Sequence, residues 1–396
     1  MLNRFLFFVL LILLVTVGCE YSSEPSEPTT ENVEATEQIL PSGTPVEGQY
    51  IIVMNKKDVA LGKSTLEMTS LAKNILADNG LSSELLGRIY SYAISGFTAT
   101  LSKNAADKLR LDPRIAIVEQ DRVISLGKPA DKGKPPKEDD SPEPQQTPWG
   151  ITRVGGASSG IGKTAWIIDT GIDLKHEDLN VDVERSVNFV TRGKDSPNDG
   201  HGHGTHVAGT VAAIDNDIDV VGVAAGASVV AVRVLNNSGS GFYSWVIAGV
   251  DYVAGAAEVG DVANLSLGGP PSEALDSAIL NAAGLGVQFS LAAGNSDADA
   301  NNFSPARVNH ANVYTISAID SSDFYASFSN WGNPPIDWAA PGVSVLSTKK
   351  GGGTTTFSGT SMSAPHVAGL LLLGSINSDG NAKEDPDKNP DPIAHK

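Results

Sequence analysis

The sequence of 396 residues contains a single cysteine, Cys19. An intrachain disulfide is therefore impossible, and core packing, aided by any bound metal ions, must stabilise the folded state. Basic residues are also scarce: 28 Lys and Arg stand against 46 Asp and Glu, which gives a formal net charge of -18. Because affinity for a nucleic-acid backbone depends on clustered Lys and Arg, nucleic acid is not expected as a partner. The acidity is better explained by a well-solvated surface.

An apolar run covers residues 5–17 and follows Arg4. It is too short to span a bilayer comfortably and has the charged start and apolar middle of a signal peptide, so we expect residues 1–19 to direct export. The end of the run, TVGC at residues 16–19, resembles the lipobox of bacterial lipoproteins, although its threonine departs from the usual aliphatic residue. The alternative is an ordinary signal peptide with an incidental cysteine. We expect lipidation of Cys19, because a sole cysteine at this site is hard to ascribe to packing.

Composition divides the rest of the chain into five stretches. Residues 20–48 are rich in Ser, Thr, Pro and Glu and contain no Lys or Arg. That composition is too polar to fold by burial and indicates a tether. Residues 49–126 carry patterned apolar runs and are expected to fold, whereas residues 127–147 are rich in Lys, Pro and acidic residues and are expected to form an exposed, cleavable linker. A second domain is expected over residues 148–374, followed by a polar, irregular tail over residues 375–396.

Apolar periodicity predicts the elements of both folded stretches. The first has a βαββαβ order, typical of a small α+β domain of ferredoxin-like type, with strands over residues 50–54, 86–92, 96–101 and 115–118 and helices over residues 64–78 and 103–110. The second alternates strands and helices: strands over residues 165–168, 229–234, 262–266, 287–292 and 313–319, and helices over residues 205–213, 244–258 and 272–283. This alternation predicts an α/β fold in which a mostly parallel sheet lies between two layers of helices.

One motif is interpreted as accidental. The segment ASSGIGKT at residues 157–164 meets a loose form of the phosphate-binding P-loop. That loop requires a strand before it and the N-terminus of a helix after it. Here a strand is expected to follow, so the segment is interpreted as a surface turn.

Two further motifs supply a carboxylate and an imidazole. An apolar run ends in Asp169, which places this residue at the carboxyl edge of the sheet, where open α/β folds bind ligands; alone, such an aspartate more often caps a turn. In GHGTHVAG, His203 lies at the mouth of a helix and can reach an Asp on one side and a nucleophile on the other, as a general base must. His206 is interpreted as a packed histidine. A metal site of His201, His203 and His206 is the alternative, but the Glu of the zinc-peptidase HExxH pattern is absent.

Two more motifs supply a nucleophile and an amide. Ser361 follows a Gly-Thr pair that permits a sharp turn, and a helix begins directly after it, so the serine N–H can face a forming oxyanion. A helix cap is the commoner role of such a serine. Asn295 follows Gly294 at the end of a predicted strand, and its amide can donate a hydrogen bond to a tetrahedral oxyanion. Each motif is weak alone, but the four in the order Asp, His, Asn, Ser are jointly specific.

These segments resemble the subtilisin-like serine proteases, or subtilases. The segments PWGITRV at Pro148, DGHGHGTH at Asp199 and NNSGSGFYS at Asn236 look most like the proteinase K branch. The resemblance covers residues 149–374 almost without interruption. Residues 49–126, especially ISGFTATLS and RIAIVEQDRVISL, are similar to the subtilase propeptide, which assists folding and inhibits the enzyme until it is cut off.

The resemblance implies a subtilisin-like three-layer fold and an acyl-enzyme mechanism. Ser361 would attack the scissile carbonyl, His203 would take its proton and Asp169 would orient the imidazole, while Asn295 and the Ser361 N–H would hold the oxyanion. Substrate backbone would pair as an added strand with two segments, and a third would line the pocket for the residue before the cut: Gly239, Ser240 and Gly241; Ser266, Leu267 and Gly268; and Ala292, Ala293 and Gly294. Such small walls imply broad specificity that leans to apolar or aromatic side chains.

The resemblance also implies a structural calcium ion, held here by Asp337 and the backbone carbonyls of Ala311 and Val313. Acidic residues also alternate in the tail, over residues 385–391, in a spacing similar to calcium loops. Because no Gly or closing Glu completes an EF-hand, the tail is interpreted as a solvated acidic segment. The paired cysteines of the family are absent.

Two functions from different classes compete at this point. The first is a secreted, monomeric endopeptidase that acts on proteins or peptides, is inhibited by its own propeptide, and cuts itself between Leu126 and Trp149. A lipid on Cys19 would anchor the propeptide half to a bacterial membrane, so that this cut would also release the catalytic domain. The second is a catalytically idle surface protein that keeps the fold as a binding module. The four motifs together favour the enzyme, because an idle scaffold needs none of them.

Overall fold

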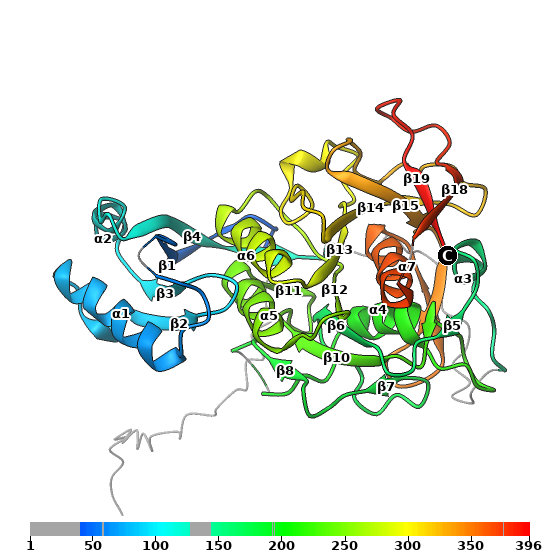
Figure 1. Ribbon diagram of the computed structural model, residues 1–396, viewed down its shortest axis with the longest axis horizontal. Helices are drawn as coiled ribbons and strands as arrows, with labels where there is room; N and C mark the ends of the chain where they lie inside the picture. The colour runs from blue at the N-terminus through cyan, green and yellow to red at the C-terminus, as the bar shows by residue number, and fades with distance from the viewer. Residues whose placement is uncertain (1–39, 58, 127–143, 192, 194, 375) are drawn as a thin grey trace, which may run out of the picture. The chain divides into compact units, whose positions relative to one another are not determined.

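The computed structural model describes residues 40–396 except for residues 58, 127–143, 192, 194 and 375. The predicted signal peptide, its Cys19, and most of the predicted tether and cleavable linker lie outside the described residues. The described chain contains an N-terminal module and a larger α/β module (Figure 1).

The N-terminal module has the predicted βαββαβ order. Its elements are β1 (Pro45–Met54), α1 (Thr65–Asp78), a short 3-10 helix η1 (Ser83–Leu85), β2 (Leu86–Tyr90), β3 (Gly96–Thr100), α2 (Lys103–Leu109) and β4 (Ile115–Ser125). Helix α1 begins at a capping box, in which Ser64 and Glu67 satisfy each other's backbone N–H groups. The strands form an antiparallel sheet in the order β4-β1-β3-β2. Met68, Ile75 and Leu109 bury both helices against one face of this sheet.

Two boundaries of this module differ from the sequence prediction. Strand β4 runs to Ser125 instead of ending at residue 118, and the folded chain begins before residue 49. The Val123 N–H donates to the Thr44 carbonyl at 2.9 Å, and the Gly43 N–H donates to the Val123 carbonyl at 2.8 Å. The end of the predicted tether is therefore held by backbone hydrogen bonds, which a polar composition does not reveal.

The larger module is built on a parallel sheet. Its long strands are β6 (Thr164–Asp169), β10 (Ser228–Arg233), β12 (Val262–Leu265), β13 (Gln288–Ala292), β14 (Val313–Ile319) and β15 (Ile336–Pro341). Short strands β7 (Asn180–Val181) and β8 (Val187–Asn188) pair with β10. With β18 (Asn377–Asn381) and β19 (Pro392–His395) at the other edge, the sheet order is β18-β19-β15-β14-β13-β12-β6-β10-β7. Among the described residues, neighbouring strands of this sheet pair in parallel, except β18 with β19, which are antiparallel. The predicted parallel sheet is confirmed.

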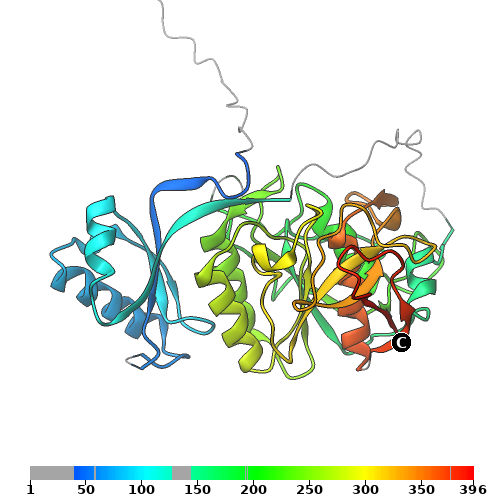
Figure 2. The same ribbon diagram turned by 90° about the horizontal axis from the view of Figure 1, so that it is seen from above.

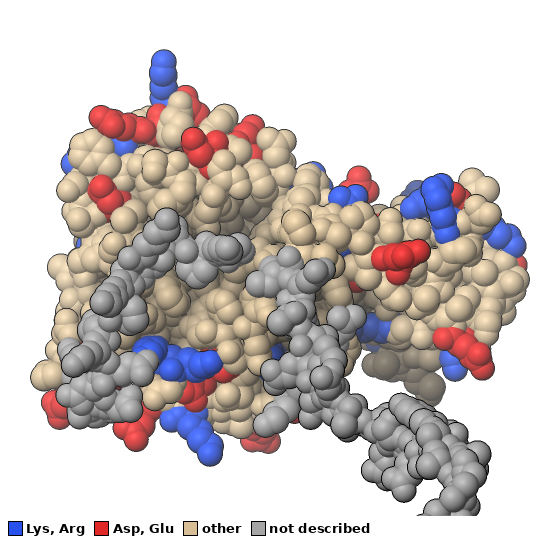
Figure 3. Space-filling model, turned by 180° about the vertical axis from the view of Figure 1, so that it is seen from behind, with Lys and Arg blue, Asp and Glu red and all other residues tan. Residues whose placement is uncertain are grey.

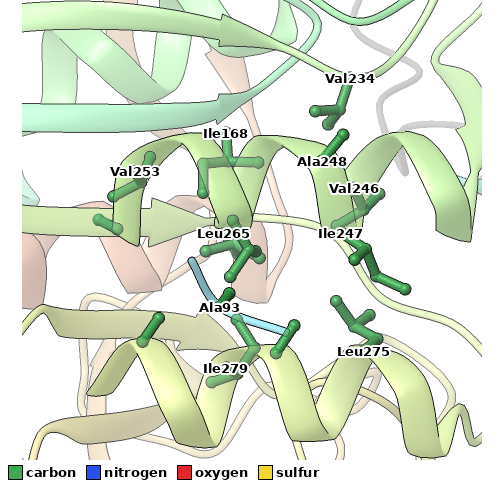
Figure 4. Packing of buried hydrophobic residues seen from close by; sticks show 14 of the residues in the cluster. Ala93, Ile168, Val234, Val246, Ile247, Ala248, Val253, Leu265, Leu275 and Ile279 are labelled. Atoms are coloured by element: carbon green, nitrogen blue, oxygen red, sulfur yellow. The ribbon is translucent and has the colours of Figure 1, made fainter. Parts of the chain in front are cut away.

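Helices cover both faces of this sheet, as predicted. The main helices are α4 (His203–Ala212), α5 (Tyr243–Ala256), α6 (Glu273–Gly284) and α7 (Thr360–Leu373), and a short α3 (Trp149–Arg153) opens the module. Alternate residues of β6 separate the two cores, because successive side chains of a strand point to opposite faces. Trp166 and Ile168 pack with α5 and α6, whereas Ala165 and Ile167 pack with α4 and α7. Figure 4 shows Ile168 and Leu265 against Val253 and Ile279 in the first core.

Smaller elements complete the module. They are β5 (Ser158–Ser159) paired with β9 (Ala224–Ala225), β11 (Ser240–Phe242), the 3-10 helix η2 (Ala300–Asn302) and the hairpin of β16 (Val345–Thr348) with β17 (Thr354–Phe357). The P-loop-like segment runs through β5 and a turn directly into β6, as its interpretation as a turn requires. On the face drawn in Figure 3, acidic and basic side chains are interspersed. The described helices include none that is long and apolar enough to cross a membrane.

The prediction of an irregular, solvated tail over residues 375–396 is wrong. Strands β18 (Asn377–Asn381) and β19 (Pro392–His395) form a hairpin, and Ala339 of β15 pairs with Ile393 of β19 at the edge of the main sheet. Ile393 and Asp391 are both buried, and the Ser317 hydroxyl donates to the Asp391 carboxylate. Strand β19 contains too few apolar residues for periodicity to predict it. Its position is set instead by pairing with the edge strand β15.

The tail hairpin predicts a measurable contribution to stability. Ile393→Ala removes a fully buried side chain that packs on Ile319 and Ala339. We expect the free energy of unfolding to fall by about 2–4 kcal/mol, through lost burial and the cavity left behind. Urea unfolding in a Ser361→Ala background, which prevents self-digestion, measures this loss. Ile161→Ala, at a position that is 81% exposed, is the matched control. Equal unfolding midpoints for the two variants would show that the hairpin does not stabilise the sheet.

Candidate active site

Asp169 and His203 form a hydrogen-bonded pair. Asp169 is the last residue of β6 and is fully buried, and His203 is the first residue of α4. The imidazole Nδ1 lies 2.8 Å from Oδ1 and 3.0 Å from Oδ2 of Asp169. Burial opposes the charged imidazolium, but the charge and hydrogen bond of Asp169, with the charge of Asp199, outweigh burial and raise the pKa of His203 above its usual value.

Glycines on both sides of His203 make this pairing possible. Gly202 has a φ of +108°, a left-handed conformation that side chains disfavour, and so lets the loop turn sharply into α4. A Cβ on Gly204 would lie 2.1 Å from the Gly171 carbonyl oxygen. Only glycine therefore allows the first turn of α4 to approach the end of β6 this closely.

Ser361 is the second residue of α7, so the helix begins one residue before it and not directly after it, as the sequence had predicted. Its hydroxyl donates to the Ser266 carbonyl oxygen at 3.1 Å, and the Ser266 hydroxyl donates to the Ser361 carbonyl at 2.8 Å. The described residues include no hydrogen bond between Ser361 and His203, although both line the same cleft. The hydroxyl of Ser361 is thus bonded to the Ser266 carbonyl and not to the imidazole, and catalytic hydrogen bonds of this kind commonly tighten only in the reacting complex.

The amide oxygen of Asn295 is held by the residue that precedes Ser361. This oxygen accepts hydrogen bonds from the Thr360 N–H at 2.8 Å and from the Thr360 hydroxyl at 3.0 Å. The same hydroxyl accepts the Gly294 N–H at 3.0 Å. The Asn295 amide NH₂ is thereby left as the donor beside Gly359 and the Ser361 N–H. Sequence reasoning missed Thr360, which fixes this orientation.

The predicted substrate residues gather around these groups. A cavity of about 460 Å³ is lined by His203, Ser361 and Asn295, and by six residues predicted to contact substrate: Ser266, Leu267, Gly268, Ala292, Ala293 and Gly294. Phe303, Ala306 and Phe328 add apolar walls that the sequence did not identify. The remaining predicted segment, Gly239 to Gly241, lies at β11, beside the cleft.

The end of β4 from the N-terminal module lies in this cleft. Strand β4 pairs antiparallel with β11, with Ser125 opposite Ser240 and Ile124 opposite Gly241. The Leu126 N–H donates to the Gly239 carbonyl at 3.0 Å, and Leu126 lines the cavity with His203 and Ser361. The chain thus lays its own strand along the predicted substrate-binding edge and stops, within the described residues, beside the candidate nucleophile.

Comparisons with known proteins agree with this geometry. The sequence profile described as the subtilase family matches residues 162–377. The chain belongs to the subtilase family of serine proteases. A second profile, peptidase inhibitor I9, matches residues 49–127, so the N-terminal module of this subtilase is an inhibitory propeptide.

Individual relatives support the proteinase K-like assignment. The subtilase is 39% identical over 356 residues to alkaline serine exoprotease A of Vibrio alginolyticus, with 87% of this chain covered; it spans only 63% of that relative. It is 34% identical over 362 residues to proteinase R of Parengyodontium album, covering 87% of this chain and 86% of the relative. The crystal structure of a cold adapted subtilisin-like serine proteinase matches with a TM-score of 0.55 and 40% identity, over 62% of this chain and 97% of that one.

Three carboxylates tie the propeptide to helices α5 and α6 of the subtilase module, beside which it lies (Figures 1 and 2). Asp251 of α5 accepts the backbone N–H groups of Ser91, Tyr92 and Ala93, with the Ala93 bond at 2.7 Å. In the other direction, Asp121 of β4 accepts the N–H and hydroxyl of Ser244 at the start of α5, and Glu119 accepts the Ala274 N–H at the start of α6. Carboxylates at helix N-termini satisfy free N–H groups and complement the helix dipole. Ala93 also packs between the two helices (Figure 4).

The predicted calcium residues lie on neighbouring strands. Asp337 of β15 accepts the Thr315 N–H at 2.9 Å, and Val313 begins the adjacent β14, two residues after Ala311. Burial raises the pKa of Asp337 to about 6. One carboxylate with backbone carbonyls is a donor set that suits calcium, which prefers oxygen ligands.

A second oxygen-rich place escaped sequence reasoning. Asp178 is fully buried; it accepts the Asn216 amide at 2.8 Å and the Val220 N–H at 3.3 Å. The Gln145 amide oxygen accepts the Asn216 N–H at 2.9 Å, which brings a third side chain to the loop. Burial raises the pKa of Asp178 to about 7, and no salt bridge between described residues neutralises it. Residues this far apart in the sequence form no local motif.

The alternative histidine metal site gains no support. His206 Nε2 contacts the Val345 carbonyl oxygen at 3.0 Å, its ring stacks on Phe357, and burial lowers the pKa of His206 to about 3. It is the packed histidine that the sequence favoured. Among the described residues, no group of three or more His, Cys, Asp or Glu side chains could hold a metal ion.

The interface carboxylates predict that the affinity of the propeptide for the subtilase module depends on pH. Burial raises the pKa of Asp121 to about 6, above its usual value of 3.8. A group whose pKa is raised in the complex favours the complex at low pH and loses that contribution as pH rises through the raised value. We therefore expect propeptide affinity to fall by up to about 100-fold between pH 4 and pH 7. Asp121→Asn should remove the part of this slope that comes from Asp121, while Glu119 and Asp251, whose pKa values burial also raises, keep their own contributions.

The measurement uses the Ser361→Ala chain after its linker has been cut by a trace of active enzyme. Size-exclusion chromatography across this pH range then reports the dissociation of the propeptide. Asp107→Asn, a change on α2 at a half-buried aspartate that bonds Lys103 and Arg110 of the same segment, is the matched control. An equal slope in the Asp121→Asn and unmodified complexes would contradict the role of Asp121.

Proposed function

We propose that this subtilase is a secreted serine endopeptidase, made as a self-processed zymogen, that uses Asp169, His203 and Ser361 as catalytic residues. One observation carries the proposal. The chain's own strand β4 is paired with β11, and the next residue, Leu126, lies in the cleft lined by Ser361 and by His203, the partner of Asp169. A polypeptide segment is therefore already held where a substrate of this enzyme would bind.

The residues suit acyl transfer step by step. The Ser361 oxygen attacks the scissile carbonyl carbon as its proton passes to Nε2 of His203, and Asp169 stabilises the resulting imidazolium. The oxyanion accepts hydrogen bonds from the Asn295 amide and the Ser361 N–H. The carbon–nitrogen bond breaks as His203 returns the proton to the departing amine. Water, deprotonated by the same histidine, then attacks the acyl carbon and releases Ser361.

The cleft supports broad specificity that leans to apolar or aromatic residues before the cut. Ala292, Ala293 and Gly294 leave space in the pocket, and the aromatic rings of Phe303 and Phe328 line it with apolar surface. Substrate backbone pairs with β11 as β4 does, and this pairing depends little on side-chain identity.

Maturation follows from the same arrangement. Gln145 and Gln146 donate their N–H groups to the Asp217 and Asp219 carbonyls. The chain is therefore part of the folded subtilase module from residue 145 onward. The self-cleavage predicted between Leu126 and Trp149 is thereby narrowed to residues 127–144. The signal peptide and the lipid on Cys19 lie outside the described residues and stay predictions. With that lipid, cleavage would leave the anchor on the propeptide and free the catalytic module.

The decisive experiment compares the wild-type chain with Ser361→Ala. We expect the wild type to hydrolyse casein, to react with a serine-directed fluorophosphonate, and to yield a mature form whose N-terminus lies within residues 128–145. Ser361→Ala should stay full-length, without labelling or hydrolysis. Asn295→Ala should mature slowly, with kcat reduced by about 10²–10³. A wild type that neither labels nor hydrolyses would support the idle binding module.

Two places are proposed to hold calcium, which would supply structural charge compensation and no catalytic step. The first, expected from the sequence, uses Asp337 with the carbonyls of Ala311 and Val313. The second uses Asp178 with the amide oxygen of Gln145, and Asn216 links the two by donating its amide N–H to Asp178 and its backbone N–H to Gln145. In both, a carboxylate whose pKa is raised by burial has no cationic side chain as a salt-bridge partner among the described residues, and Asp178 is fully buried whereas Asp337 is half-buried.

Chelation tests the second place. A ligand present at about 100 times its dissociation constant stabilises the folded state by about 2.7 kcal/mol. We expect EDTA to shorten the thermal-inactivation half-life of the mature enzyme, and Asp178→Ala to shorten it equally and to make it less sensitive to added calcium. Asp217→Ala, at an exposed position on the same loop, should behave as wild type. A full calcium response in Asp178→Ala would exclude this place.

A further inference from the structure

We propose that Asp199 is a positioning residue that holds the loop bearing His203 in register with Asp169 and adds a second negative charge behind the imidazole. This inference rests on the proposed catalytic role of His203. Its basis is a set of contacts around one carboxylate that does not touch the substrate cleft: Asp199 is absent from the cavity lining and is 1% exposed.

The Asp199 carboxylate accepts five hydrogen bonds. Oδ1 accepts the N–H groups of His201 and Gly202, both at 2.8 Å, and the hydroxyl of Thr170 at 2.9 Å. Oδ2 accepts the N–H and the hydroxyl of Thr205, at 3.0 and 2.7 Å. Both oxygens are used, and the donors come from both sides of His203.

These bonds join the two elements that carry the candidate dyad. Thr170 directly follows Asp169 at the end of β6, and its hydroxyl, while donating to Asp199, accepts the Gly204 N–H at 2.9 Å. The residues next to Asp169 and on both sides of His203 are therefore fixed by the same carboxylate.

A simple helix cap explains only part of this arrangement. Helix α4 has Gly202 as its N-cap residue, without a side chain to accept the free N–H groups, so Asp199 performs that task from outside the helix. A cap, however, needs neither the bond to Thr170 nor a full charge. Because an aspartate at this place is buried beside a histidine that must become charged, its charge also acts on the imidazolium.

The charges around His203 come from several elements. Asp169 ends β6, Asp199 precedes α4, and the His201 ring centroid lies 6.3 Å from that of His203. His206 lies on α4 and interacts with His203, while Lys350 donates to the Gly200 carbonyl from the loop of the β16–β17 hairpin.

Arg233 is the cation that faces Asp199, and it is held by the carbonyls of Ser196 and Asn198. Of these groups, Asp169 and Asp199 raise the pKa of His203, against the effect of burial.

Asp199→Asn tests the proposal on mature enzyme whose active-site concentration is normalised by fluorophosphonate titration. Activity requires neutral His203, so the acidic limb of kcat/KM lies at the pKa of this residue in the free enzyme. Removing the negative charge should move this limb to lower pH. Looser positioning should lower kcat by about tenfold or more while KM changes little.

Two further variants separate charge from positioning and keep the test valid where Asp199→Asn does not mature. Thr170→Val removes the link to Asp169 but keeps the charge, so kcat should fall with no shift of the acidic limb, and Thr170→Ser should restore kcat. Asp261→Asn is the matched control: this buried aspartate bonds the Trp166 indole elsewhere in the sheet. Its kcat and pH profile should equal those of wild type.

The outcomes are distinct. A wild type without hydrolysis or labelling contradicts the proposed function itself. If the wild type is active, the inference is overturned when Asp199→Asn has the same kcat and the same acidic limb of kcat/KM as Asp261→Asn. It is also overturned when Thr170→Val has an unchanged kcat. A lower melting temperature in Asp199→Asn with an unmoved acidic limb also overturns it, because a cap alone would then account for the residue.

Discussion

The parallel order of three neighbouring strands, β6, β12 and β13, is the constraint on which the site depends. The carboxyl ends of parallel strands meet at one edge of a sheet. Asp169 ends β6, Ser266 follows β12, and Asn295 follows β13. Helices α4 and α7 begin at the same edge and bring His203 and Ser361 to these groups. Five residues spread over nearly two hundred positions thus converge without any long-range motif.

The site is held together by satisfying polar groups in a buried environment. A buried carboxylate is costly unless donors surround it, and Asp199 is surrounded by five. Thr360 likewise fixes Asn295: it donates two hydrogen bonds to the amide oxygen, so that the amide hydrogens remain for the cleft. In both cases a residue outside the reacting group determines which atoms face the substrate.

The interface between the propeptide and the subtilase module also depends on satisfying polar groups with hydrogen bonds. Strand β4 of the propeptide pairs with β11, and the propeptide carboxylates accept hydrogen bonds from the free N–H groups at the starts of α5 and α6. Ile51, Val53 and Tyr90 complete the apolar core that the outer face of these helices would otherwise expose to water. Strand pairing, helix capping and apolar packing are therefore combined in one interface.

The sequence by itself determined the two modules, nearly all of their long elements, and the four motifs of the candidate site, because apolar periodicity and turn residues are local signals. Tertiary structure alone decided the rest. The backbone pairing of residues 43–44 and of β19 involves polar stretches with no periodic signal. The partners Thr360 and Asp199, and the place formed by Gln145, Asp178 and Asn216, depend on distances between segments far apart in the chain. Only folding sets these distances, since each side chain gains its role from neighbours that its own segment does not contain.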